Sequence, residues 1–319
     1  MILQKYDSGF YICWITLYGI KIILVKMTLQ QCDRNGGIMP STYAHYRMGQ
    51  EVYGKLEGEP KKIIQKYKEL YDIGLHGPDV LFYYKPLYEH LVNKTGYDMH
   101  SEPGIRFFKE AYDIIAEKKD KQAYLAYIYG FCCHFALDVS CHGYIDYKIK
   151  NSGISHTEIE VEFDRRLMLK DGYNPITHRL TGHINPNEYN SQIISSFYEN
   201  ITPGQVQQAL KGMISYNNLL IAPSHIKRMF IYGLLKATGN YKEMHGLIVN
   251  YNENPSCADS TKQLYKLYKD ARQLAVKLIN EYTDSGAGKI AFDEKYSYTF
   301  GGEKGKISKG SEEWRVLWE

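Results

Sequence analysis

The sequence has few cysteines, few tryptophans and almost no excess of charge of either sign. It holds 6 cysteines in 319 residues, and no two of them form a C-x-x-C pair. A disulfide framework is therefore not predicted, and a reducing compartment is the simpler inference. The net charge of +3 argues against an extended surface for nucleic acid. Neither internal repeats nor long alternating strand patterns occur before Ile290, so a β-rich fold is not expected.

What remains is an ordinary globular composition with an excess of one aromatic residue. The chain is 44% hydrophobic and 24% charged, and it has 30 tyrosines beside 11 phenylalanines and 3 tryptophans. Tyrosine suits helix surfaces and wet pockets equally well, so we interpret this excess as compositional bias. The length allows one large domain with a sizeable core.

The first 38 residues differ from the rest. The run from Gly9 to Met27 is apolar except for Lys21 and Lys26, and it has the length of a membrane span. A lysine within the span is costly in a bilayer, and a cleavage site for a signal peptide is missing. We favour translation beginning at Met39, which predicts a cytoplasmic protein. If residues 9–27 belong to the protein, a membrane-anchored or exported location is expected instead.

From Met39 onwards the pattern is helical, and we predict one all-α domain over residues 39–300 with a flexible tail over 301–319. Ser41 or Thr42 is expected to cap the first helix. Residues 96–100 are expected to form a turn, and residues 301–319 are polar and glycine-rich. The predicted helices span residues 46–56, 61–70, 80–93 with a bend near Pro86, 103–118, 122–148, a run from 153 to about 170, 188–198, 203–221, 225–238 and 259–282.

One stretch of the sequence contains closely spaced histidine and aspartate residues. Between Gly130 and Tyr144 the sequence reads G-F-C-C-H-F-A-L-D-V-S-C-H-G-Y, which places His134, Asp138 and His142 four residues apart. On a helix these three side chains share one stripe, and the residues between them are apolar. Buried polar groups without partners are costly, so the stretch indicates either a metal ion or an ion-paired core histidine.

A second pair favours the metal. His156 and Glu160 also lie four residues apart, on a predicted amphipathic helix, so they share a face and could chelate an ion. Imidazole combined with carboxylate is typical of zinc sites. One zinc takes three or four protein ligands, so these five residues predict at least two ions.

The motifs resemble those of the zinc-dependent phospholipase C family. The runs H-F-A-L-D-V-S-C-H and H-T-E-I-E carry the resemblance, and M-P-S-T-Y-A-H, G-P-D and G-Y-D-M-H precede them in the expected order. The resemblance covers roughly residues 39–282. The family has an all-helical domain with three zinc ions in a cleft. Three residues separate Asp138 from His142, whereas the secreted enzymes have five, so the chain resembles the uncharacterised bacterial branch.

The resemblance implies a set of eight metal ligands. It assigns one zinc to His134, Asp138, Asp79 and His100, a second to His142, His156 and Glu160, and a third to His45 with Asp138 shared. In the family the processed N-terminus completes the third site. Here that group would come from near Pro40, so a chain with 38 preceding residues would hold two ions and a chain starting at Met39 would hold three.

The implied activity is hydrolysis of a phosphate ester by zinc-bound hydroxide, with Asp79 orienting the water and accepting its proton. A phospholipid is the expected substrate, with transient contact to a membrane surface, no specific nucleic acid and no obligate protein partner. Two alternatives remain, a single-strand nuclease of the same fold and a degenerate metal-binding domain. The histidine–aspartate phosphohydrolases of helical fold need a His-Asp dipeptide, which this sequence lacks.

Other polar residues near the motifs have simpler explanations. Asp79 could instead cap a helix, and His76 and His90 compete with His100 for its place. Asp164 is expected to support a ligand or to pair with an arginine. Structural or surface roles are expected for the remaining histidines, which are His178, His183, His225 and His245.

Overall fold

The structure is a computed structural model, and it describes the backbone of residues 3–5, 11–17 and 20–23 together with residues 41–86, 90–237, 239, 241–285 and 293–304. The α-helices and 3-10 helices (η) are α1 (Thr42–Lys55), α2 (Gly58–Lys66), α3 (Lys68–Gly74), η1 (Gly77–Tyr83), α4 (Leu91–Ser101), α5 (Gly104–Ala116), α6 (Lys121–Ser152), α7 (His156–Lys170), α8 (Glu188–Ser195), α9 (Pro203–Leu220), α10 (His225–Ala237), α11 (Tyr241–Met244), η2 (His245–Leu247), η3 (Pro255–Cys257), α12 (Ala258–Ser285) and η4 (Glu294–Ser297).

Within residues 41–304 the described chain is all-α apart from two isolated bridges, Pro103 to Thr299 and Tyr298 to Lys304. The predicted fold class is therefore confirmed. The division into residues 1–38, 39–300 and 301–319 stays a prediction. Of the tail, residues 301–304 close a turn in which the Thr299 N–H donates to the Glu303 carbonyl at 2.9 Å. Residues 305–319 lie outside the described residues.

Three short strands precede the helices, in a segment for which the sequence predicted none of useful length. They are β1 (Leu3–Lys5), β2 (Tyr11–Leu17) and β3 (Ile20–Ile23), paired antiparallel in the order β1-β2-β3. Residues 24–40, which include Met39 and Pro40, lie outside the described residues. Among the helices described, none combines the length and the apolar character that crossing a bilayer requires.

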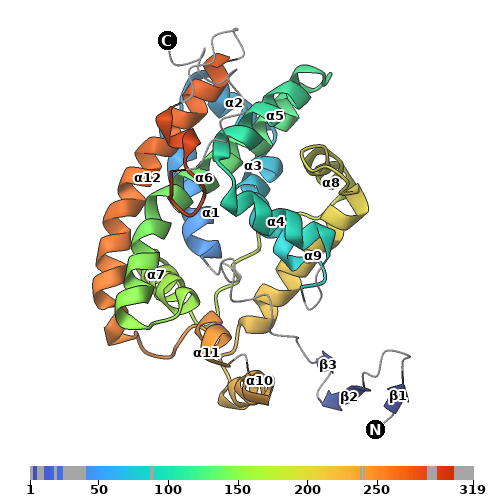
Figure 1. Ribbon diagram of the computed structural model, residues 1–319, viewed down its shortest axis with the longest axis vertical. Helices are drawn as coiled ribbons and strands as arrows, with labels where there is room; N and C mark the ends of the chain where they lie inside the picture. The colour runs from blue at the N-terminus through green and yellow to red at the C-terminus, as the bar shows by residue number, and fades with distance from the viewer. Residues whose placement is uncertain are drawn as a thin grey trace.

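The 32-residue helix α6 is the central element, and it packs between α12 on one side and α3 on the other (Figure 1). The backbones of α3 and α6 meet at two glycines. A Cβ on Gly74 would lie 2.2 Å from the Tyr127 carbonyl oxygen, and one on Gly130 would lie 2.2 Å from that of Tyr71. This close contact holds the segment after α3, which is η1, against the middle of α6.

The α6–α7 connection is a sharp turn that the sequence specifies locally. Gly153 ends α6 in the left-handed conformation with φ of 69°, and its N–H donates to the carbonyl of Ile149, as is typical of a glycine after a helix. Ser155 then caps α7 by accepting from the Glu158 N–H at 3.3 Å. The first turn of α7 is thereby brought back beside the second half of α6.

Two predictions around α4 are wrong. A helix over residues 80–93 does not form, because η1 ends at Tyr83 and Lys85, which precedes Pro86, has a positive φ of 46°. Residues 96–100 are not a turn but the last part of α4. A Cβ on Gly96 would lie 2.9 Å from the Phe82 ring, so this glycine allows helix packing instead of turning the chain. The predicted helix 61–70 is also divided, into α2 and α3, at Tyr67.

Candidate metal centre

The stripe on α6 is buried and faces the other candidate ligands. Asp138 is 1% exposed, and its Oδ2 lies 3.1 Å from His134 Nε2. Its Oδ1 lies 3.9 Å from His142 Nε2. The predicted helical register therefore holds, with Asp138 between the two imidazoles.

Helices η1 and α4 bring Asp79 and His100 to one end of this stripe. Asp79 Oδ1 lies 3.0 Å from His100 Nε2 and 3.8 Å from His134 Nε2. His100 Nδ1 donates to the Gly96 carbonyl at 2.7 Å, which leaves Nε2 directed at the carboxylates. Gly77 has φ of 48°, and a Cβ there would lie 2.2 Å from the His134 ring. A glycine at this position thus lets η1 approach the imidazole.

Helix α7 supplies the candidate ligands at the other end. Glu160 Oε1 lies 3.7 Å from His142 Nε2, and Glu160 Oε2 lies 3.3 Å from His156 Nε2. His142 Nδ1 donates to the Phe300 carbonyl at 2.9 Å, which fixes the ring with Nε2 toward Glu160 and Asp138. Hydrogen bonds of this kind orient the imidazoles of metal sites.

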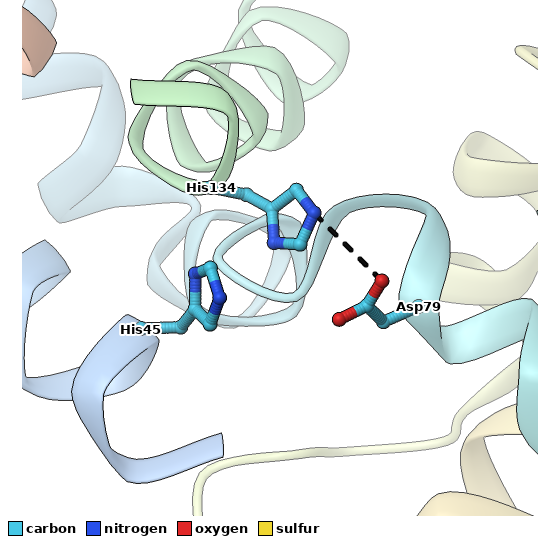
Figure 2. A group of neighbouring side chains, drawn as sticks. All are labelled: His45, Asp79 and His134. Atoms are coloured by element: carbon cyan, nitrogen blue, oxygen red, sulfur yellow. Dashed lines mark ion pairs between the residues drawn. The ribbon is translucent and has the colours of Figure 1, made fainter. Parts of the chain in front are cut away.

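His45 on α1 completes the group. Its Nε2 lies 3.2 Å from Asp138 Oδ1, and its ring stacks on that of His134 with centroids 4.5 Å apart. Figure 2 shows how His45, Asp79 and His134 point toward one another from α1, η1 and α6.

Asp164 holds the beginning of α1 in place. Its Oδ2 accepts the N–H of Tyr43 at 2.9 Å, and its Oδ1 accepts that of Ala44 at 2.8 Å. Ser41 stands at the N-cap position without a side-chain hydrogen bond, so the prediction that Ser41 or Thr42 caps this helix is wrong. Asp164 supports the residues just before His45 and bonds backbone instead of an arginine.

The arrangement fits a metal because several of its buried polar atoms make no hydrogen bond within the described residues. Among the described residues, no hydrogen bond reaches Oδ2 of Asp138, Oδ1 of Asp79, Oε2 of Glu160 or Nε2 of His134, although all are buried. Such groups are costly unless something satisfies them. Three sets, whose ligand atoms lie within 4.8 Å of one another, are His45 with Asp79 and His134, His100 with His134 and Asp138, and His142 with His156 and Glu160.

The electrostatics favour ionised carboxylates. Burial opposes the charge on Asp138, but the imidazoles of His134 and His142 outweigh it and hold the pKa of this carboxyl well below its usual range. Burial is likewise outweighed at Glu160, where His156 and His142 lower the pKa to about 2. The carboxylates in turn raise the pKa of His142 to about 9 against the effect of burial. The centre therefore gathers the negative charge and nitrogen donors that a divalent cation needs.

All eight residues predicted as ligands come together in this one centre. Of the competing histidines, His76 is buried beside the centre but bonds His183, with 2.7 Å between their Nε2 atoms, and His183 stacks on the Tyr46 ring at 3.9 Å. His90 caps α4 by accepting the N–H of Val92 at 3.2 Å. Neither joins the three sets of ligands.

Sequence reasoning missed the groups that orient the ligands. The carbonyls of Gly96 and Phe300 accept from His100 and His142, and main-chain acceptors leave no sequence signal. The group expected from near Pro40 lies outside the described residues, so the completeness of the third site stays a prediction.

Comparison with known proteins identifies the family. The family model described as zinc dependent phospholipase C matches residues 44–209, which is more than half of the chain and includes all eight candidate ligands. No curated protein and no solved structure gives a match. The family is zinc-dependent, and the clusters of histidine and carboxylate found here are groups that can bind zinc. The chain therefore belongs to the zinc-dependent phospholipase C family.

Proposed function

We propose that this protein is a zinc-dependent phosphodiesterase that acts on phospholipids. The observation that carries the proposal is the group of eight buried or half-buried candidate ligands from five helices, several of whose polar atoms make no hydrogen bond within the described fold. Family membership supports a hydrolase with a lipid substrate. Two or three zinc ions would be held, with Asp138 shared between sets because its two oxygens face different imidazoles.

Zinc bound by these residues would lower the pKa of water toward neutrality and offset negative charge on the phosphate. The chain's own residues then have separate tasks. Asp138 and Glu160 stay ionised and hold the imidazoles in register. Asp79 contributes from η1, and we assign it the orientation of the attacking water and the acceptance of its proton. His100 and His156, at opposite ends of the centre, are its two more exposed residues, with exposed fractions of 17% and 18%, and we assign the entry of substrate to this exposed side.

The test is zinc content combined with paired substrates. We expect purified protein to contain two zinc ions per full chain, and three when the chain starts at Met39. It should release a phosphorylated head group from phosphatidylcholine and leave single-stranded DNA intact. His134→Ala should lower both zinc content and hydrolysis. The control is His178→Ala, which should change neither, because the His178 ring stacks on that of Tyr173 with centroids 4.1 Å apart and is not one of the candidate ligands.

Each result has a distinct meaning. Protein without zinc refutes the metal centre. Zinc with full phosphodiesterase activity in His134→Ala refutes the site assignment. Degradation of single-stranded DNA without release of a head group would favour the nuclease alternative.

A further inference from the structure

Helix α10 buries an arginine and exposes several of its large apolar side chains. Arg228 is 6% exposed and is the buried side chain of this helix. It donates from Nε to the Ala222 carbonyl at 2.7 Å and from Nη2 to the Val249 carbonyl at 2.6 Å. Its guanidinium also lies 3.8 Å from the centroid of the Tyr251 ring. The helix is thus attached to the domain through an arginine whose charge is stabilised by two carbonyl groups and an aromatic ring.

The opposite face carries large apolar side chains in contact with solvent. Ile226 and Met229 are each 66% exposed, and Phe230 is 54% exposed. Their spacing of three and four residues places them on one face of the helix. A surface helix normally turns such a stripe toward the core. An apolar stripe turned outward marks a surface that contacts something else.

Along the chain, the residues on both sides of this stripe carry charge of one sign. No aspartate or glutamate occurs from Asn200 to Lys242, and the same stretch holds Lys211, Lys227, Arg228, Lys236 and Lys242. At 100° per residue, Lys227 and Lys236 fall on opposite flanks of the apolar stripe, and Lys227 Nζ donates to the Ile221 carbonyl at 2.6 Å. Apolar residues between flanking lysines are typical of a helix that lies in the interface of an anionic membrane.

The helix preceding α10 contacts two segments that carry metal ligands. Near the end of α9, Asn217 accepts from Thr42 Oγ1 at 3.5 Å and donates to the Tyr83 hydroxyl at 3.4 Å. Thr42 lies three residues before His45, and Tyr83 lies four residues after Asp79. Residues 221–224 then lead directly into α10.

The segment after α10 contacts a third segment that carries candidate metal ligands. Helix α10 is followed by α11 and η2, which pack against α7 (Figure 1). His245 Nε2 lies 3.7 Å from Glu158 Oε2, and Glu158 stands between His156 and Glu160 on the first turn of α7. The contacts on both sides of α10 therefore connect it to the metal centre.

We propose that α10 is a membrane-docking surface that inserts Ile226, Met229 and Phe230 among the head groups of an anionic phospholipid bilayer. It would hold the metal centre beside its lipid substrate, and in that respect it rests on the proposed function. Binding itself requires no hydrolysis, so the two can be tested separately.

The experiment is flotation of the full, zinc-loaded chain with vesicles of phosphatidylcholine containing phosphatidylserine, and with vesicles of phosphatidylcholine alone. The variant Met229→Glu combined with Phe230→Glu changes only exposed side chains. We expect its partitioning onto the anionic vesicles to fall by about tenfold or more. Its hydrolysis of a soluble phosphodiester, p-nitrophenyl phosphorylcholine, should be unchanged. The matched control is Tyr147→Glu, at a site on α6 that is 62% exposed, and it should bind vesicles as the unmodified chain does.

The outcomes separate this proposal from the proposed function. The docking surface is overturned if the double variant still binds vesicles, or if the unmodified chain does not bind them. Hydrolysis of the soluble phosphodiester would in either case still support the proposed enzymatic function. Loss of binding in the double variant, with no hydrolysis by any form, supports the docking surface and refutes the enzyme. If the unmodified chain is a dimer that does not bind vesicles, and the double variant is a monomer, then a second copy of the chain covers α10 and the proposal is overturned.

Discussion

Two clusters of charge lie side by side on α1, and they differ in how their carboxylates are satisfied. Arg47 donates to both oxygens of Asp171, at 2.6 and 3.0 Å, and to Glu51. Arg272 bonds the second oxygen of Glu51 at 2.6 Å. Two residues before Arg47, His45 belongs to the metal centre, where the carboxylates face imidazoles and leave oxygens without a hydrogen bond among the described residues.

This difference distinguishes a cluster of charges that stabilises the fold from one that can bind a ligand. In the first cluster, which is partly exposed, arginine supplies a donor for each carboxylate oxygen, so the cluster is complete without a ligand. In the second cluster the carboxylates are almost fully buried and imidazole is the main partner. Two of these imidazoles, those of His100 and His142, direct Nδ1 to a backbone carbonyl. Oxygens of Asp79, Asp138 and Glu160 are left without a hydrogen bond in the described part of the chain. A cation satisfies these acceptors, and the comparison predicts where substitution will remove a function and where it will not.

The largest effect is expected for Asp138→Asn. The substitution keeps the shape of the side chain but removes the charge that faces His45, His134 and His142. We expect the protein to lose at least one zinc ion and hydrolysis to fall about 100-fold or more. Elemental analysis and a phosphodiester assay measure the two effects. Retention of all zinc by the variant would contradict the role of Asp138 as the shared ligand.

A smaller effect is expected for Asp164→Asn. The carboxyl group accepts two N–H groups at the start of α1 although burial raises its pKa to about 8, and an amide offers only one oxygen to them. We expect the free energy of unfolding to fall by about 1–3 kcal/mol, measured by urea denaturation with zinc removed. With zinc present, the same variant should bind one ion more weakly, because the turn that precedes His45 is less well held. An unchanged midpoint in both conditions would show that α1 is held by packing alone.

The sequence predicted which eight residues come together better than it predicted the elements that hold them. His134, Asp138 and His142 have helical spacing, and so do His156 and Glu160, so their mutual arrangement is local and readable. Asp79 and His100 lie on segments whose structure was predicted wrongly. The close contacts of Gly77 with the His134 ring and of Gly96 with the Phe82 ring decide those segments, and a contact between distant residues leaves no local pattern.

The smallest effect is expected for Asp171→Asn, which makes the same chemical change in the arginine cluster. Side chains there are partly exposed, with fractions of 18% for Arg47 and 26% for Asp171, so we expect a loss below about 1 kcal/mol and no change in zinc content. Burial opposes ionisation of Asp171, but its bonds from Arg47 and Tyr43 outweigh burial and lower its pKa. A lowered pKa stabilises the fold above the ordinary pKa of an aspartate, about 4, and this stabilisation is lost as the pH falls through the folded value. The difference in unfolding free energy between Asp171→Asn and the unmodified chain should therefore be present at pH 7 and vanish in acid. A difference that grows in acid would show that Asp171 is not stabilised by Arg47.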